Sequence, residues 1–90
     1  MTPDETKFFQ LVDGYARARH RCFLAELNFR TEELGYSICL RPLNVSEDSD
    51  PYACKYLMVS TEQVRAPGRK ELPPSLVGQL DAELSKLKDL

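Results

Sequence analysis

Apolar residues in the first segment of the chain recur at helical spacing. They are Phe8, Leu11, Val12, Tyr15 and either Ala18 or Arg19. Thr2 and Glu5 have the spacing of a capping box, and Pro3 suits the first position of a helix because it lacks a backbone N–H. The pattern therefore predicts a helix from about residue 3 to residue 19.

After this helix the period changes to an alternation of apolar and polar residues. Ala25, Leu27 and Phe29 lie on one side of an alternating stretch, and Phe23 extends that side. The predicted strands cover residues 25–30, 36–43 and 52–60, separated by a turn at 31–35 and an acidic loop at 44–51. Pro42 has no N–H to donate to a sheet, so it ends the second strand or places it at an edge.

Residues 16–34 also have a helical interpretation. In that alternative Leu24, Leu27, Thr31 and Leu34 align on one side, and Gly35 suits a helix C-terminus. The strict alternation of residues 25–30 favours the strand, which we adopt as the prediction.

The last third of the chain carries two helical signals. Ser60 and Gln63 have capping-box spacing, which predicts one helical turn before the Ala-Pro-Gly sequence at 66–68. A final amphipathic helix is predicted from Pro73 and Pro74 to the C-terminus. Its apolar seam is Val77, Leu80, Leu84 and Leu87, widened by Leu76 and Leu90. Residues 1–90 are thus predicted to form a single α+β domain, α-β-β-β-α, with a three-stranded antiparallel sheet covered on one face by helices.

The predicted sheet has more apolar residues than one covered face requires. If Phe23, Ala25, Leu27, Phe29, Ile38 and Leu40 face the helices, then Cys22, Leu24 and Cys39 belong to the other face. The third strand is apolar on both sides, with Tyr52, Cys54, Tyr56 and Met58 on one and Ala53, Leu57 and Val59 on the other. An uncovered apolar face of this kind usually marks an interface. The alternative is that residues 61–72 fold over it.

Composition limits the classes of partner. The net charge is −2, with 42% apolar and 29% charged residues, which is ordinary for a globular protein and argues against attraction of the whole surface to nucleic acid or membrane. The N-terminal sequence lacks the layout of a secretory signal, and three cysteines are an odd number for a disulfide framework. We therefore expect reduced thiols and a cytoplasmic protein.

The residue types that carry chemistry are poorly arranged for catalysis. His20, Cys22, Cys39 and Cys54 could ligate a metal, but they lack the paired spacing of a zinc site. We interpret them as three small buried residues and one surface histidine. The four glycines form no phosphate-binding motif. The expectation is a protein that is not an enzyme and needs no cofactor or metal.

The most distinctive stretch is YARARHRCF, in which Arg17, Arg19 and Arg21 alternate. Cations at a helix C-terminus interact favourably with its dipole, and the same three could instead dock an acidic partner or a phosphate backbone. A nucleic-acid-binding alternative adds Arg65, Arg69 and Lys70. The order of elements is that of the double-stranded-RNA-binding domain, but the stretch APGRKELPPS lacks that domain's run of lysines.

The sequence therefore favours a non-catalytic protein-binding module that occupies a surface of a larger partner as a regulator, adaptor or inhibitor. The predicted partner-binding residues are Arg17, Arg19, Arg21, Tyr52, Tyr56 and Met58. The leucine seam and the apolar sheet face also predict a homodimer.

Overall fold

The computed structural model describes residues 2–43, 55–68 and 70–87. The elements are α1 (Pro3–His20), β1 (Cys22–Thr31), β2 (Gly35–Pro42), β3 (Lys55–Val59), α2 (Thr61–Arg65), α3 (Pro74–Leu84) and a 3-10 turn, η1 (Ser85–Leu87). The strands form one antiparallel sheet in the order β1-β2-β3. The predicted α+β fold and the strand interpretation of β1 are thus confirmed. The acidic loop and the first residues of the predicted third strand lie outside the described residues.

Helix α1 begins as its capping box predicts. The Thr2 hydroxyl accepts a hydrogen bond from the backbone N–H of Glu5, and the Glu5 carboxylate reaches back to the Thr2 backbone. The buried side of the helix is the row Phe8, Val12, Ala16 and His20, at intervals of four residues. Leu11 and Tyr15, which we expected in the core, are only half-buried because they lie beside this row.

A β-bulge at Ala25 overturns the expected side of β1. Leu24 pairs with Leu40 and Glu26 pairs with Cys39, so Ala25 is the extra residue on β1. The bulge reverses the alternation, and Cys22 and Leu24 therefore face the helices within the core, while Phe23 faces away. Beyond the bulge, Leu27 packs against the core as predicted.

The turn between β1 and β2 depends on Gly35. Its φ of +88° is in the region that favours glycine, and it lies against the chain that leaves β3. A Cβ at this position would overlap the Val59 carbonyl oxygen and lie 2.9 Å from the Ser60 Cα. This close approach keeps the hairpin turn next to the start of α2.

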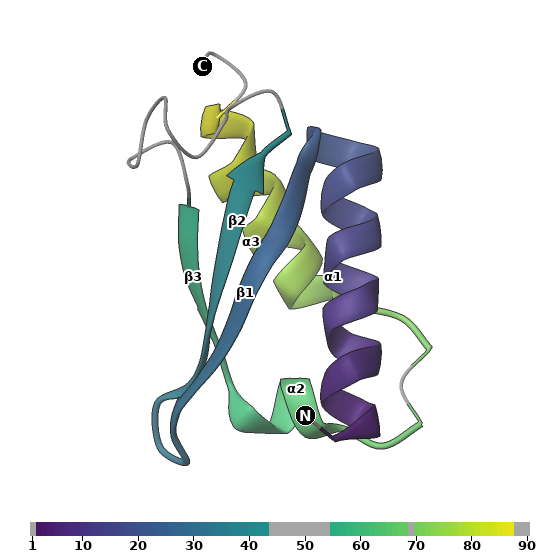
Figure 1. Ribbon diagram of the computed structural model, residues 1–90, viewed down its shortest axis with the longest axis vertical. Coiled ribbons are helices and arrows are strands. Elements are labelled where there is room, and N and C mark those ends of the chain that lie inside the picture. The colour runs from purple at the N-terminus through teal and green to yellow at the C-terminus, as the bar shows by residue number, and fades with distance from the viewer. Residues whose placement is uncertain (1, 44–54, 69, 88–90) are drawn as a thin grey trace.

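The helices lie on one side of the sheet and beside it. Figure 1 shows α1 running along β1, α3 passing behind the strands and α2 near the N-terminal end of α1. The buried seam of α3 is Leu76, Leu80 and Leu84. Val77, which was predicted to belong to this seam, is half-buried. The buried residues repeat every four positions from Leu76, so Val77 lies beside their row. The predicted turn at 61–65 is α2, capped by the Ser60 hydroxyl.

Candidate interaction surfaces

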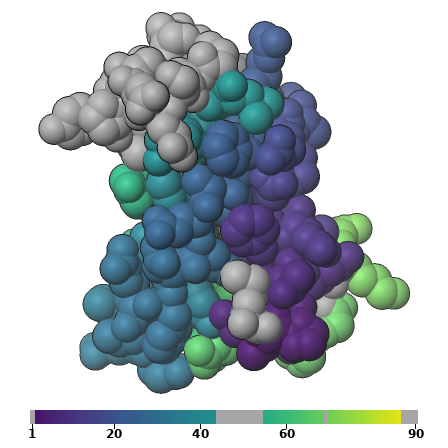
Figure 2. Space-filling view, viewed as in Figure 1, coloured from purple at the N-terminus to yellow at the C-terminus, as the bar shows by residue number. Residues whose placement is uncertain are grey.

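The sheet presents one face that no described helix covers, which we name the outer sheet face. Strand register and the composition of the core assign it Phe23, Glu26, Asn28, Ser37, Cys39, Arg41, Tyr56 and Met58. Figure 2 shows this side, where blue and teal side chains of the β1–β2 hairpin lie at the surface beside purple α1. Among the described residues no helix covers this face, and its members differ from the prediction because of the bulge.

The edge of the outer sheet face along β3 is apolar. Tyr56 and Met58, both on β3, are 59% and 48% exposed. Opposite them on β2, Cys39 and Ser37 are buried despite facing away from the helices. Tyr52, the third aromatic or apolar residue expected here, lies outside the described residues. Two large exposed apolar side chains on adjacent rows are typical of a contact surface.

Arg17, Arg19 and Arg21, the three arginines predicted to form a basic strip, contact different parts of the molecule. Arg17 pairs with Asp13 at 3.0 Å, and its guanidinium lies 5.4 Å from the centre of the Phe23 ring. The Arg19 Nε lies 3.7 Å from the Asp81 carboxylate of α3. Arg21 is exposed and ends α1 in the left-handed conformation. Arg17 and Arg21 thus lie toward β1, and Arg19 lies toward α3.

His20 is buried, which corrects the expectation of a surface histidine. Its side chain is 4% exposed, and its Nε2 lies 2.8 Å from Asp81 Oδ1, which also accepts a hydrogen bond of 2.8 Å from the Tyr15 hydroxyl. The hydrogen bonds from Tyr15 and His20 hold the pKa of Asp81 below its usual value, and the bond to Asp81 raises the pKa of Tyr15. The other ring nitrogen, Nδ1, is buried without a hydrogen-bond partner. This cluster joins the end of α1 to α3 and closes the histidine off from solvent.

The three described residues of the set considered for a metal site, His20, Cys22 and Cys39, do not share one site. Cys22 lies in the core, where burial raises the pKa of its thiol, whereas Cys39 lies on the outer sheet face. Cys54 is outside the described residues. Within residues 2–43, 55–68 and 70–87, no three His, Cys, Asp or Glu side chains form a group that could hold a metal ion.

The cations of the nucleic-acid alternative are also separated. Arg65 donates from Nε to the Tyr36 hydroxyl at 2.8 Å, pairs with Glu32 at 3.0 Å and stacks on Phe29, 4.8 Å from the ring centre. These contacts tie α2 to the β1–β2 hairpin. Lys70 is exposed on another part of the surface, and Arg69 lies outside the described residues. The described members of this group therefore do not form a continuous basic strip.

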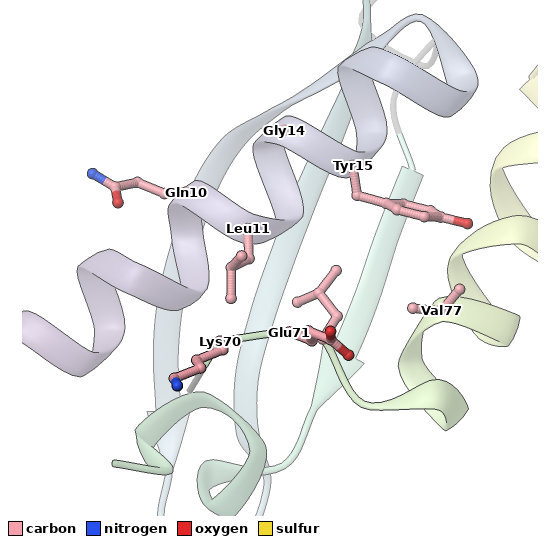
Figure 3. Close-up of a pocket in the computed structure, with 8 residues that line it drawn as sticks. Gln10, Leu11, Gly14, Tyr15, Lys70, Glu71 and Val77 are labelled. Atoms are coloured by element: carbon pink, nitrogen blue, oxygen red, sulfur yellow. The ribbon is translucent and has the colours of Figure 1, made fainter. Parts of the chain in front are cut away.

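A shallow groove of about 470 Å³ lies between α1, the segment that precedes α3, and α3 itself. Figure 3 shows Leu11 pointing toward that segment and the Tyr15 ring extending toward α3. Leu11, Tyr15, Leu72 and Val77 make its apolar lining, and Gln10, Gly14, Lys70 and Glu71 complete it.

No family model matches the chain, and no curated protein or solved structure matches it either. Among the described helices, none has both the length and the apolar character to cross a membrane.

Two residues of the outer sheet face were missed in the sequence, Phe23 and Arg41. The alternation assigned Phe23 to the core, and Arg41 looked like an ordinary charge near the end of a strand. Hairpin register, which pairs Phe23 with Arg41, is the signal that identifies them. That register depends on the bulge at Ala25, which the alternation conceals.

Proposed function

We propose that this protein is a non-catalytic binding module that regulates, adapts or inhibits a larger protein by covering part of its surface. The observation that carries the proposal is the outer sheet face, where Tyr56 and Met58 are exposed in the middle of a sheet strand. Aromatic residues and methionine are enriched at protein interfaces, and exposed apolar surface gains free energy when a partner removes it from water.

Charge distribution favours a protein over a nucleic acid as the partner. Three arginines that could contact phosphates, Arg17, Arg19 and Arg65, have acidic neighbours within the chain. Non-specific binding to nucleic acid needs several uncommitted cations on one surface. The burial of His20 and the use of its Nε2 by Asp81 support a non-catalytic role. The odd number of cysteines supports a cytoplasmic location.

Affinity capture with matched variants tests this function. The immobilised chain is exposed to a lysate of the source organism, in parallel with a Tyr56→Ser/Met58→Ser double variant and a Leu34→Ser control. Leu34 is exposed at the hairpin turn, away from the outer sheet face, so its replacement removes a similar apolar side chain elsewhere. A protein retained by the wild type and the control but lost with the double variant is the expected result.

The captured protein is then purified and titrated with the three chains. Because hot-spot side chains lie near the centre of an interface, the double variant should bind the captured protein about tenfold or more weakly. Equal retention on all three chains would exclude the part of the outer sheet face formed by Tyr56 and Met58 as the binding surface. Binding to generic RNA at ~50 mM salt that falls by orders of magnitude at ~200 mM salt would instead favour the nucleic-acid alternative.

A further inference from the structure

One end of the outer sheet face combines three arginines with two apolar side chains. We name this group, Arg17, Arg21, Phe23, Arg41 and Leu43, the cationic corner. Phe23 is paired with Arg41 across the hairpin, and the backbone N–H of Leu43 donates to the Arg21 carbonyl at 2.9 Å. The Arg17 guanidinium lies over the Phe23 ring. Residues from α1, β1 and the end of β2 therefore meet at a single corner of the sheet.

Two of these cations have no acidic partner within the described chain. Neither the Arg21 nor the Arg41 side chain forms a hydrogen bond or ion pair with the described residues, and Arg41 is half-buried. Arg17 is partly neutralised by Asp13. None of the guanidinium nitrogens of Arg41 is buried without a partner, and Arg21 is exposed, so both guanidinium groups remain accessible. An external anion at this corner could pair with both.

The apolar members define what kind of anion fits. Leu43 is 49% exposed and Phe23 is half-buried, so they offer apolar contact next to the guanidinium groups. Arginine recognises carboxylates with two parallel hydrogen bonds, and charge pairs beside apolar anchors are typical of protein interfaces. Three cations are few for a nucleic-acid backbone, which carries a charge at every nucleotide.

We propose that the cationic corner binds an acidic protein segment in which carboxylates flank an apolar side chain. The apolar side chain would pack on Phe23 and Leu43, and the carboxylates would pair with Arg21 and Arg41. This inference rests on the proposed function, because it describes the chemistry of a partner that also covers Tyr56 and Met58.

The test is a titration of the ¹⁵N-labelled chain, followed by NMR, with the blocked tripeptide Glu-Phe-Glu. Its matched neutral control is Gln-Phe-Gln, and oligouridine represents a nucleic-acid backbone. The expected result is a saturable change in the chemical shifts of the Phe23, Arg41 and Leu43 amides. The Kd should be about 1 mM, because so small a ligand makes few contacts. The neutral tripeptide should bind more than about tenfold more weakly, since it lacks both carboxylates and each charge-assisted hydrogen bond contributes roughly that factor.

Variants separate a specific site from general attraction. We expect Glu-Phe-Glu to bind about tenfold more weakly to each of two single variants, Arg41→Gln and Arg21→Gln. Of the two residues, Arg21 is the more exposed. Arg30→Gln is the control, because Arg30 is an exposed cation near the other end of β1, and it should change Kd by less than about twofold. If Arg41→Gln loses the dispersed spectrum of a folded chain, Arg21→Gln alone carries the comparison.

Three outcomes would overturn the inference: equal binding of both tripeptides, an equal loss with Arg30→Gln, or tighter binding of oligouridine than of Glu-Phe-Glu. Its failure is distinguishable from failure of the proposed function. If capture of a protein requires Tyr56 and Met58 but not Arg21 and Arg41, then only the cationic corner is excluded as a binding site. If the tripeptide binds at the corner but the Tyr56→Ser/Met58→Ser variant captures the protein as well as the wild type does, then only the role of Tyr56 and Met58 in protein binding is excluded.

Discussion

At the scale of single residues, Gly35 has the least freedom to change. It combines a positive φ with a close approach to the backbone of Val59 and Ser60. We expect Gly35→Ala to reduce the free energy of unfolding by about 3 kcal/mol or more, because both the backbone strain and the overlap must be relieved. Denaturant unfolding followed by circular dichroism measures this loss.

Gly68 provides the matched control for that prediction. Its φ of +67° is also positive, but a Cβ there would meet nothing within 4 Å. Gly68→Ala should therefore cost only the conformational strain, about 1 kcal/mol. Similar losses at Gly35 and Gly68 would contradict the close approach between the hairpin turn and the end of β3.

Asp81 gives the fold a defined sensitivity to acid. Hydrogen bonds from Tyr15 and His20 lower its pKa from the ordinary value of 3.8, so the folded state favours the carboxylate. A group with a lowered pKa contributes stability that is fully present above its unfolded pKa and is lost as the pH falls through the folded one. This contribution should therefore be complete above about pH 4 and disappear below it.

Asp81→Asn isolates this effect. The variant should be less stable than the wild type at pH 7, and the difference in denaturant midpoint should shrink as the pH is lowered from 5 to 2, through the window set by the lowered pKa. Glu33→Gln, at an exposed turn position, is the control and should follow the wild-type profile. A constant difference between Asp81→Asn and the wild type across this range would show that the carboxylate charge has no part in the contact.

The histidine shows why single-residue roles were only partly predictable. Its position at the end of a helix was evident from the sequence, but its burial depends on Asp81, which is 61 residues away. The helical period placed Leu11 and Tyr15 on the apolar side as readily as Ala16 and His20. Which row is buried follows from the packing of α1 on β1 and α2, with α3 contributing through Asp81 at the His20 end.

At the scale of elements, the bulge in β1 decides which residues enter the core. We expect Leu24→Ala to lower the free energy of unfolding by about 2–5 kcal/mol, because the side chain is buried in the core. Phe23→Ala should cost about 1 kcal/mol, since it removes a larger but half-buried ring and its contact with Arg17. Denaturant unfolding of the pair tests the bulge directly. A larger loss of stability for Phe23→Ala than for Leu24→Ala would instead support the unbroken alternation predicted from the sequence.

Local signals predicted the elements better than their faces. The capping box at Thr2, the cap at Ser60 and the alternation in β1 depend on neighbours along the chain, and each marks its element correctly. A bulge needs only one additional residue, and Ala25 carries no turn signal that would reveal it. Sides of strands and helices follow from tertiary contacts, so the outer sheet face was predicted to exist but its members were partly wrong.

At the scale of the whole molecule, we expect assembly to depend on the outer sheet face. Without another partner, we expect two copies to pair through it, because a symmetric contact buries Tyr56 and Met58 of both. Light scattering should give a mass approaching twice the 10.3 kDa of one chain as the concentration rises from micromolar to millimolar.

Met58→Lys should return the mass to that of one chain, since the substitution places a charge within an apolar contact. Leu34→Lys makes the same change at an exposed position away from this face and should leave the dimer intact. Dissociation by both variants would mean that net charge, rather than the outer sheet face, governs assembly. A wild-type chain that keeps the mass of one copy at every concentration would exclude the symmetric dimer and leave Tyr56 and Met58 available to a different protein.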